Sequence, residues 1–378
     1  AVPTGPSIRN WTASLRTTGT LPELSTDPRT EVAVLQYTGG TTGRPKAAML
    51  THRNLVANAL QCAAWFRRDA NGEDCVLAAV PFFHVYGMTV ALNYPLIAGA
   101  SIVMQTRPDT DEALGLISKY RPTQFPGVPA MYQAINHHKD LAKYDIRSIK
   151  ICVSGSAPLP REVAKRFEEL TGGNLIEGYG LTEASPVTHA NPIHGERRPG
   201  TIGLPFPNTD QRVVDLETGH RPLGVGEAGE LCVRGPQVML GYFGQPGETA
   251  MVLVDGWLHT GDIATIDADG YVSIIDRKKD VINVSGFKVY PREVEEVLYQ
   301  HPSVAEAAAI GVPDEEHGEV VKAFVVLKAG TTASESDLIQ FVRERIAHYK
   351  APRTVEFRTS LPRSGVQKVL RRELRVSA

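Results

Sequence analysis

The chain lacks several features that would assign it to a specialised class of protein. It has four cysteines in 378 residues and no Cys-x-x-Cys pair, so we expect no disulfide framework. The adjacent His137 and His138 have no acidic or cysteine partner at ligand spacing, which argues against a zinc site. A formal net charge of -2 gives no reason to expect nucleic acid as a partner. With no signal-peptide pattern at its start, the chain is expected in the reducing cytoplasm.

A long uninterrupted apolar run is also missing. The longest apolar region, residues 76–104, is broken by Pro81, His84, Asn93 and Pro95. No stretch of about 18 apolar residues survives, so we expect buried strands and a short helix there rather than a membrane-spanning helix. Contact with a membrane surface stays open, and so does the oligomeric state.

The patterns that are present predict an α/β protein. From Glu31 on, apolar runs alternate with amphipathic segments, as expected for an α/β sheet with ligand-binding loops at its strand ends. Between residues 200 and 276, short β-rich runs alternate with Gly/Pro turns and predict a β-rich subdomain. After the charge run at 277–280, a compact α+β pattern follows. We therefore predict a large N-terminal domain over 1–276 and a small C-terminal domain over 277–378.

The same patterns predict individual elements. Strands are expected at 31–37, 47–50, 149–153, 175–176, 307–312 and 320–327. Helices are expected at 51–65, 159–170, 293–300 and 338–346. Thr51 should cap the first of these helices, whose buried face is predicted to hold Leu55, Ala59, Leu60 and Ala63.

The segment from Tyr37 to Lys46, Tyr-Thr-Gly-Gly-Thr-Thr-Gly-Arg-Pro-Lys, carries the strongest functional signal. Glycines let backbone N–H groups approach an anion, and threonine hydroxyls can reach phosphate oxygens or a phosphate-bound metal. It is not a Walker A loop, because no Gly-Lys-Ser/Thr follows. The alternative is a polar hairpin turn between two buried strands. The residues predicted to cradle a triphosphate are Thr38, Gly39, Gly40, Thr41, Thr42, Gly43 and Lys46.

Two later segments support a nucleotide site. Small residues follow the predicted strand at 149–153 and would let a planar ring approach the backbone. Glycines flank Tyr179, whose ring could stack on a base, and Glu183 offers a hard oxygen ligand for Mg²⁺. The alternatives are a small-residue turn before a helix and a polar loop with a capping threonine. The predicted nucleotide contacts are Gly155, Ser156, Ala157, Glu177, Gly178, Tyr179, Gly180 and Thr182.

Two further features are weaker on their own. Asp262, in Gly-Trp-Leu-His-Thr-Gly-Asp, could accept hydrogen bonds from both ribose hydroxyls, or could simply turn the chain. Lys368, in the basic C-terminal stretch, could close over a reacting phosphate and stabilise the transition state. A solvated basic tail is the alternative for that stretch.

Taken in order, these motifs resemble those of the adenylate-forming superfamily of acyl- and aryl-CoA synthetases and luciferases. The segments Gly-Trp-Leu-His-Thr-Gly-Asp and Asp-Arg-Lys-Lys-Asp are most similar to bacterial long-chain fatty acid–CoA ligases. The resemblance runs from about Glu31 to Arg375. It implies that a fatty acid carboxylate attacks the α-phosphate of ATP to give acyl-AMP, and that coenzyme A then displaces AMP to form a thioester.

The resemblance also implies roles for single residues. Thr38 and Glu183 would lie near Mg²⁺, and Thr182 would approach the α-phosphate. Asp262 and Arg277 would hold the ribose. The further residues it implies are Lys368 as the catalytic lysine, His84 beside the acyl carboxylate, Lys279 as the domain hinge, and the Gly286 loop with Lys288 near the thioester site.

The chain departs from that family at both ends. Gln367 precedes Lys368 where the family usually has glycine, and far fewer residues precede the glycine loop than in family members. An N-terminal subdomain is therefore expected to be missing, leaving an apolar face exposed and activity uncertain. Two other functions stay open: adenylation with transfer to a carrier-protein thiol, and a non-catalytic nucleotide-binding fragment.

Overall fold

The computed structural model describes residues 27–38, 45–66, 74–363 and 369–376. The strands are β1 (Val32–Thr38), β2 (Lys46–Thr51), β3 (Cys75–Ala78), β4 (Ser101–Met104), β5 (Ile151–Ser154), β6 (Asn174–Gly180), β7 (Val187–Ala190), β8 (Leu204–Pro205), β9 (Asp210–Val214), β10 (Gly229–Arg234), β11 (Leu253–Val254), β12 (Trp257–Ile266), β13 (Val272–Arg277), β14 (Ile282–Val284), β15 (Phe287–Val289), β16 (Val304–Asp314), β17 (Gly318–Leu327) and β18 (Thr354–Phe357).

The α-helices are α2 (His52–Phe66), α3 (Tyr94–Ala98), α4 (Thr110–Tyr120), α5 (Pro129–Asn136), α6 (Arg161–Thr171), α7 (Pro246–Val252), α8 (Pro291–Tyr299), α9 (Glu335–Arg343) and α10 (Arg371–Val376). The shorter helical turns are the π-helix η1 (Gly87–Asn93) and the 3₁₀ turns η2 (Leu141–Lys143), η3 (Thr182–Ala184), η4 (Lys278–Asp280) and η5 (His348–Lys350).

A parallel sheet covered by helices on both faces forms the first part of the molecule. β3 pairs with β4 and β5 with β6, both parallel, and Gln124 bridges the two pairs into one sheet. One face packs on α4, α5 and α6, and the other on α2, η1 and α3. Because both faces are covered, all four residues of β5 are buried, as the apolar sequence of this strand requires.

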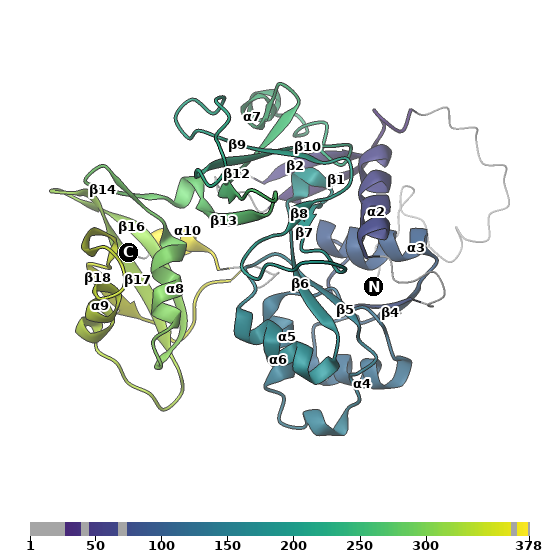
Figure 1. Cartoon of the computed structure of the whole chain (residues 1–378), viewed down its shortest axis with the longest axis horizontal. Helices are drawn as coiled ribbons and strands as arrows, with labels where there is room; N and C mark the ends of the chain where they lie inside the picture. Colours follow the sequence, from purple (N-terminus) through teal and green to yellow (C-terminus); the bar gives the residue numbers. More distant parts are fainter. Residues whose placement is uncertain (1–26, 39–44, 67–73, 364–368, 377–378) are drawn as a thin grey trace, which may run out of the picture.

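Antiparallel strands follow, in agreement with the predicted β-rich subdomain. β9, β10, β11, β12 and β13 form a five-stranded sheet, in which β12 pairs with both β10 and β13. In Figure 1 this sheet lies between the parallel sheet and the C-terminal elements. Its strand β13 runs directly into η4, so the position of this sheet fixes where the last part of the chain begins.

The C-terminal elements form a separate α+β unit, at the left of Figure 1. The order of its sheet is β15-β14-β17-β16, with β18 parallel to β17. Apolar residues of α8 and α9 pack on this sheet in a core of their own. The fold class expected from the sequence, a large α/β domain with a β-rich part and then a small α+β domain, is confirmed.

The predicted strand–loop–strand–helix around the glycine segment is present, with two differences. β1 and β2 pair antiparallel, and the Thr51 hydroxyl accepts a hydrogen bond from the Asn54 amide (3.1 Å) at the start of α2. Leu35 and Tyr37 are exposed, so β1 is not a buried strand. Leu60 is also exposed, because the buried face of α2 meets backbone carbonyls. The Asn58 and Gln61 amides occupy that face and donate to those carbonyls.

The apolar region at 76–104 contains two strands and short helical segments, as predicted. Among the helices that the structure describes, none has the length and apolar character needed to span a bilayer. Large apolar side chains are exposed on this region and on the neighbouring α2. They are Val56 and Leu60 on α2, Leu96 and Ile97 on α3, and Met104 on β4.

Candidate functional site

The hairpin formed by β1 and β2 places two of the predicted phosphate-binding residues side by side. Thr38, the last residue of β1, pairs with Lys46, the first residue of β2. The Lys46 ammonium forms an ion pair with Glu248 and lies 5.2 Å from the centroid of the Tyr242 ring. The other five predicted residues of this loop, Gly39, Gly40, Thr41, Thr42 and Gly43, lie outside the described residues.

The turn η3 lies against this hairpin and supplies a carboxylate. Oε1 of Glu183 accepts a hydrogen bond from the Tyr242 hydroxyl (2.7 Å). Within the described ranges, neither Oε2 of Glu183 nor the Thr182 hydroxyl has a hydrogen-bond partner. The structure describes no cluster of three or more His, Cys, Asp or Glu that could hold a metal alone. One carboxylate oxygen without a described partner, on a turn that lies against the β1–β2 hairpin, fits Mg²⁺ that is bound chiefly by phosphate and water.

The segments predicted to hold the base leave neighbouring parallel strands at the same edge. Ser154, the last residue of β5, pairs with Glu177 in β6, so Gly155 to Ala157 lie beside Glu177 to Gly180. A Cβ on Gly180 would lie 2.1 Å from the Pro186 carbonyl oxygen. Close approach of two chain segments therefore requires glycine at this position. Burial raises the pKa of the Glu177 carboxyl to about 7, against the opposing charge of Arg292.

Asp262 is the centre of a three-residue cluster. Its Oδ2 accepts from the Tyr179 hydroxyl (2.5 Å), and its Oδ1 is 2.9 Å from Nε of Arg277. Burial and the neighbouring Asp262 charge hold the pKa of Tyr179 well above its usual range, and the same carboxylate raises the pKa of Arg277. Because each carboxylate oxygen has two acceptor sites, this buried aspartate can still accept hydrogen bonds from a diol.

His84, the histidine predicted beside the acyl carboxylate, lies in a segment that reaches both β1 and the Gly155 segment. The Gln36 side chain of β1 donates to the Phe83 carbonyl (3.1 Å), and the Tyr86 ring lies 3.4 Å from where a Cβ on Gly155 would be. Between these two contacts, Nδ1 of His84 accepts from the Tyr86 amide (3.2 Å), which leaves the proton on Nε2. Burial lowers the pKa of His84, so its ring is neutral at neutral pH and can donate from Nε2.

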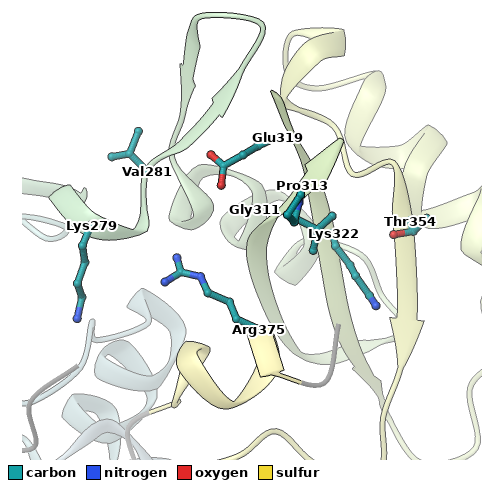
Figure 2. A pocket seen from close by; sticks show the side chains of 9 residues that line it. Lys279, Val281, Gly311, Pro313, Glu319, Lys322, Thr354 and Arg375 are labelled. Atoms are coloured by element: carbon teal, nitrogen blue, oxygen red, sulfur yellow. The ribbon is translucent and has the colours of Figure 1, made fainter. Parts of the chain in front are cut away.

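The remaining predicted residues lie apart, in the C-terminal unit. Gly286, with φ of +87°, forms the tip of the β14–β15 hairpin, and Lys288 is exposed on β15. Lys279 borders an open groove of about 710 Å³, and Figure 2 shows Arg375 reaching into the space between Lys279 and Glu319. Burial and the charges of Arg277 and Arg375 lower the pKa of Lys279 to about 8. Lys368 lies outside the described residues.

Three residues with notable contacts were missed. Tyr242 bonds Glu183 and Glu248 pairs with Lys46, so both contact predicted residues, and Arg371 joins Asp276 and Asp280 on either side of residues 277–279. None of the three has a sequence signal, because each partner is distant along the chain. A lone Tyr between glycines, or one Arg in a basic run, is common at protein surfaces.

Strand ends that gather hydroxyl, glycine and carboxylate groups, on a large α/β domain with a small α+β domain behind it, define the class of adenylate-forming proteins. The chain belongs to the AMP-binding enzyme family. The model of that family matches residues 6–243, and the model of the AMP-binding enzyme C-terminal domain matches residues 293–368.

Relatives and solved structures agree with this assignment. The chain is 52% identical over 355 residues to a long-chain-fatty-acid–CoA ligase of Bacillus subtilis, covering 94% of this chain and 63% of that protein. It is 40% identical to a feruloyl-CoA synthase of an Amycolatopsis species, covering 91% and 70%. It superimposes on ATP-bound MatB from Rhodopseudomonas palustris with a TM-score of 0.91 at 35% identity, covering 97% and 72%. The chain thus spans less than two thirds of the Bacillus relative.

Proposed function

We propose that this chain is the greater part of an AMP-forming acid–thiol ligase that activates a fatty acid and transfers it to coenzyme A. A carboxylate oxygen bonds to the α-phosphorus of ATP as pyrophosphate leaves. The thiol sulfur of coenzyme A then bonds to the acyl carbon, the thiol proton is released, and AMP leaves. The proposal is supported chiefly by the 52% identity to a long-chain-fatty-acid–CoA ligase.

The residues divide between the two ends of the nucleotide. Thr38 and Lys46 would bind the outer phosphates, while Glu183 and the Thr38 hydroxyl would hold Mg²⁺, which neutralises phosphate charge when bound. Asp262 and Arg277 would hold the ribose. The small groups at the ends of β5 and β6 would leave room for the adenine.

We assign the boundary between the domains to residues 276 and 277, with Lys279 as the hinge. Asp262 and Glu230 of the preceding sheet hold Arg277 and Lys278, respectively. From the other side, the Arg292 amide donates to Asp276. A hinge between these anchors would let Lys368 serve the first step and the Gly286 loop serve the second.

We also propose that the protein acts in the cytoplasm. Its four free cysteines fit a reducing compartment.

Pyrophosphate exchange tests the reaction. ATP–pyrophosphate exchange would be measured with acetate, benzoate, octanoate and palmitate, and we expect the two fatty acids to support the fastest exchange. Lys368→Ala should lower the rate about 100- to 1,000-fold, because it removes a charge from the transition state, and should leave ATP binding nearly unchanged.

Other outcomes of this experiment would each favour a different function. Faster exchange with benzoate would indicate an aryl acid, as the 40% identity to a feruloyl-CoA synthase makes reasonable. ATP binding without exchange would indicate a nucleotide-binding fragment. Thioester formation on a carrier protein but not on coenzyme A would indicate the carrier-dependent reaction.

A further inference from the structure

Tyr242 connects the phosphate-binding hairpin with the carboxylate of η3. Its hydroxyl donates to Oε1 of Glu183 at 2.7 Å, although 59 residues separate the two along the chain. Oε2 of Glu183 is left without a partner among the residues that the structure describes. One oxygen of this carboxylate is therefore fixed by the protein, and the other is available to a ligand.

The position of the hydroxyl is set by the backbone on both sides of Tyr242. Gly241 accepts from the Met49 amide (2.9 Å) and Phe243 donates to the Ala47 carbonyl (2.8 Å), so this segment adds to the edge of β2. The Tyr242 amide donates to the Thr249 hydroxyl (2.8 Å). With three backbone contacts, the segment has little freedom to move relative to the hairpin.

The ring is held as firmly as the backbone. Only 6% of Tyr242 is exposed, and it packs in a core with Ala48, Leu50 and Met239. On its other side lies the Lys46 ammonium, which is itself paired with Glu248. The hydroxyl therefore reaches Glu183 from a rigid base, which is what precise orientation of a carboxylate requires.

A hydroxyl is a suitable donor for a carboxylate that must stay charged. An arginine or lysine at this place would neutralise Glu183 and compete with a cation, whereas a neutral hydroxyl orients the group and leaves its charge available. The hydroxyl lies 2.7 Å from Oε1 of Glu183, and because a carboxylate only accepts, the phenol is the donor of this hydrogen bond.

We propose that Tyr242 is a positioning residue for the divalent cation that accompanies the triphosphate: its hydroxyl fixes Glu183 so that Oε2 faces the cation. The inference rests on the proposed function, because it takes Glu183 as the cation ligand. Hydrogen-bond partners of metal-binding carboxylates usually change metal affinity about 10- to 100-fold when they are removed.

The variant Tyr242→Phe tests this, because it keeps the ring in its core and removes only the hydroxyl. Calorimetry would give the Kd of the full chain for a non-hydrolysable ATP analogue, once with Mn²⁺ and once in EDTA. The ratio of the two Kd values measures what the metal contributes. We expect this contribution to fall about tenfold or more in Tyr242→Phe, with binding in EDTA changed less than twofold.

Tyr132→Phe is the matched control. The Tyr132 hydroxyl is also buried, but it donates to the carbonyls of Phe125 and Val153 in a different core. We expect this variant to keep the full metal contribution. In a Glu183→Gln background, Tyr242→Phe should have no further effect on the metal contribution, because the hydroxyl would act only through that carboxylate.

The outcomes separate the two proposals. If the unaltered chain binds the analogue equally with and without metal, the role of Glu183 in the proposed function fails, and the role of Tyr242 fails with it. If the unaltered chain needs the metal and the metal contributes as much to binding in Tyr242→Phe, only the role of Tyr242 is overturned. An equal loss in Tyr132→Phe would also overturn it, because the effect would then be general destabilisation.

Discussion

The carboxylates of the proposed nucleotide site and those of the proposed hinge are held in opposite ways. Glu183 is bonded by one neutral hydroxyl and keeps an oxygen free of described partners. At the hinge, Arg371 binds both oxygens of Glu295 (2.8 and 2.7 Å) and approaches Asp280 at 3.4 Å. Arg375 donates to the other oxygen of Asp280 at 3.1 Å.

This difference indicates which carboxylates stabilise the fold and which remain available to bind a ligand. Buried carboxylates that already have arginine partners have little capacity for a cation, so their charges serve to hold elements together. A carboxylate that is oriented by a neutral donor keeps its charge for something absent from the chain. Partners thus distinguish the two kinds of carboxylate: Asp276 and Asp280 are buried against arginine, and the half-buried Glu183 is not.

The largest expected effect is at the hinge. Arg371→Ala leaves the buried Glu295 and Asp276 without their main counter-charge, which typically costs about 3–5 kcal/mol. Hydrogen exchange of the β16 and β17 amides would measure the loss of protection in the C-terminal unit, which should be large. Arg166→Ala, which removes an exposed pair with Glu169, is the control and should change protection by less than about 0.5 kcal/mol.

If Arg371→Ala leaves protection unchanged, these carboxylates do not depend on the arginine. The contrast with Glu183 would then lose its physical basis. Since α10 begins three residues after Lys368, the same variant should also misplace that lysine, which pyrophosphate exchange would detect separately from stability.

Sequence patterns predicted the local parts of this molecule well. Strands such as β5 are short apolar runs next to turn signals, and Gly172, with φ of +68°, ends α6 within one residue of the predicted end at residue 170. Leu60 was assigned to the wrong face, because the periodicity of α2 does not reveal that its buried side meets polar backbone.

In the candidate site, too, residues in local motifs were predicted, and residues defined by distant contacts were not. Single motifs supplied Glu183 and Asp262, because both are close in sequence to glycines that mark a turn, whereas Arg277 came only from the resemblance to the adenylate-forming superfamily. Tyr242 could not be found from a motif, because it is identified only by its contact with Glu183, which is 59 residues away along the chain. Long-range partners depend on strand register, which a single sequence does not fix.

An intermediate effect is expected at Glu177, where the nucleotide side meets Arg292 of the C-terminal unit. Burial raises its pKa from 4.5 to about 7, so the unfolded chain loses this proton at lower pH than the folded protein. Its contribution to the free energy of unfolding therefore falls between pH 4.5 and 7 and is constant above, a loss on the order of 3 kcal/mol.

Glu177→Gln should remove that part of the pH dependence. Urea unfolding at pH 5 should give nearly equal free energies for the variant and the unaltered chain, and at pH 8 the variant should be more stable. A variant that is less stable at pH 8 would mean that the ionised carboxylate is stabilised by Arg292, and Glu177 would belong with the hinge carboxylates.

The smallest effect is expected at the ion pair of Lys46 and Glu248. The Glu248 side chain is 37% exposed, so solvent screening limits the pair to less than about 1 kcal/mol of stability, and Glu248→Gln should hardly change the melting temperature. Because the substitution removes a negative charge beside a predicted phosphate ligand, metal-free ATP should bind about two- to fivefold more tightly at low salt, and the gain should shrink at high salt. Weaker binding would instead mean that Glu248 positions Lys46, as Tyr242 is proposed to position Glu183. The ion pair would then belong to the fixed part of the site, and the contrast with the hinge would hold for Glu183 alone.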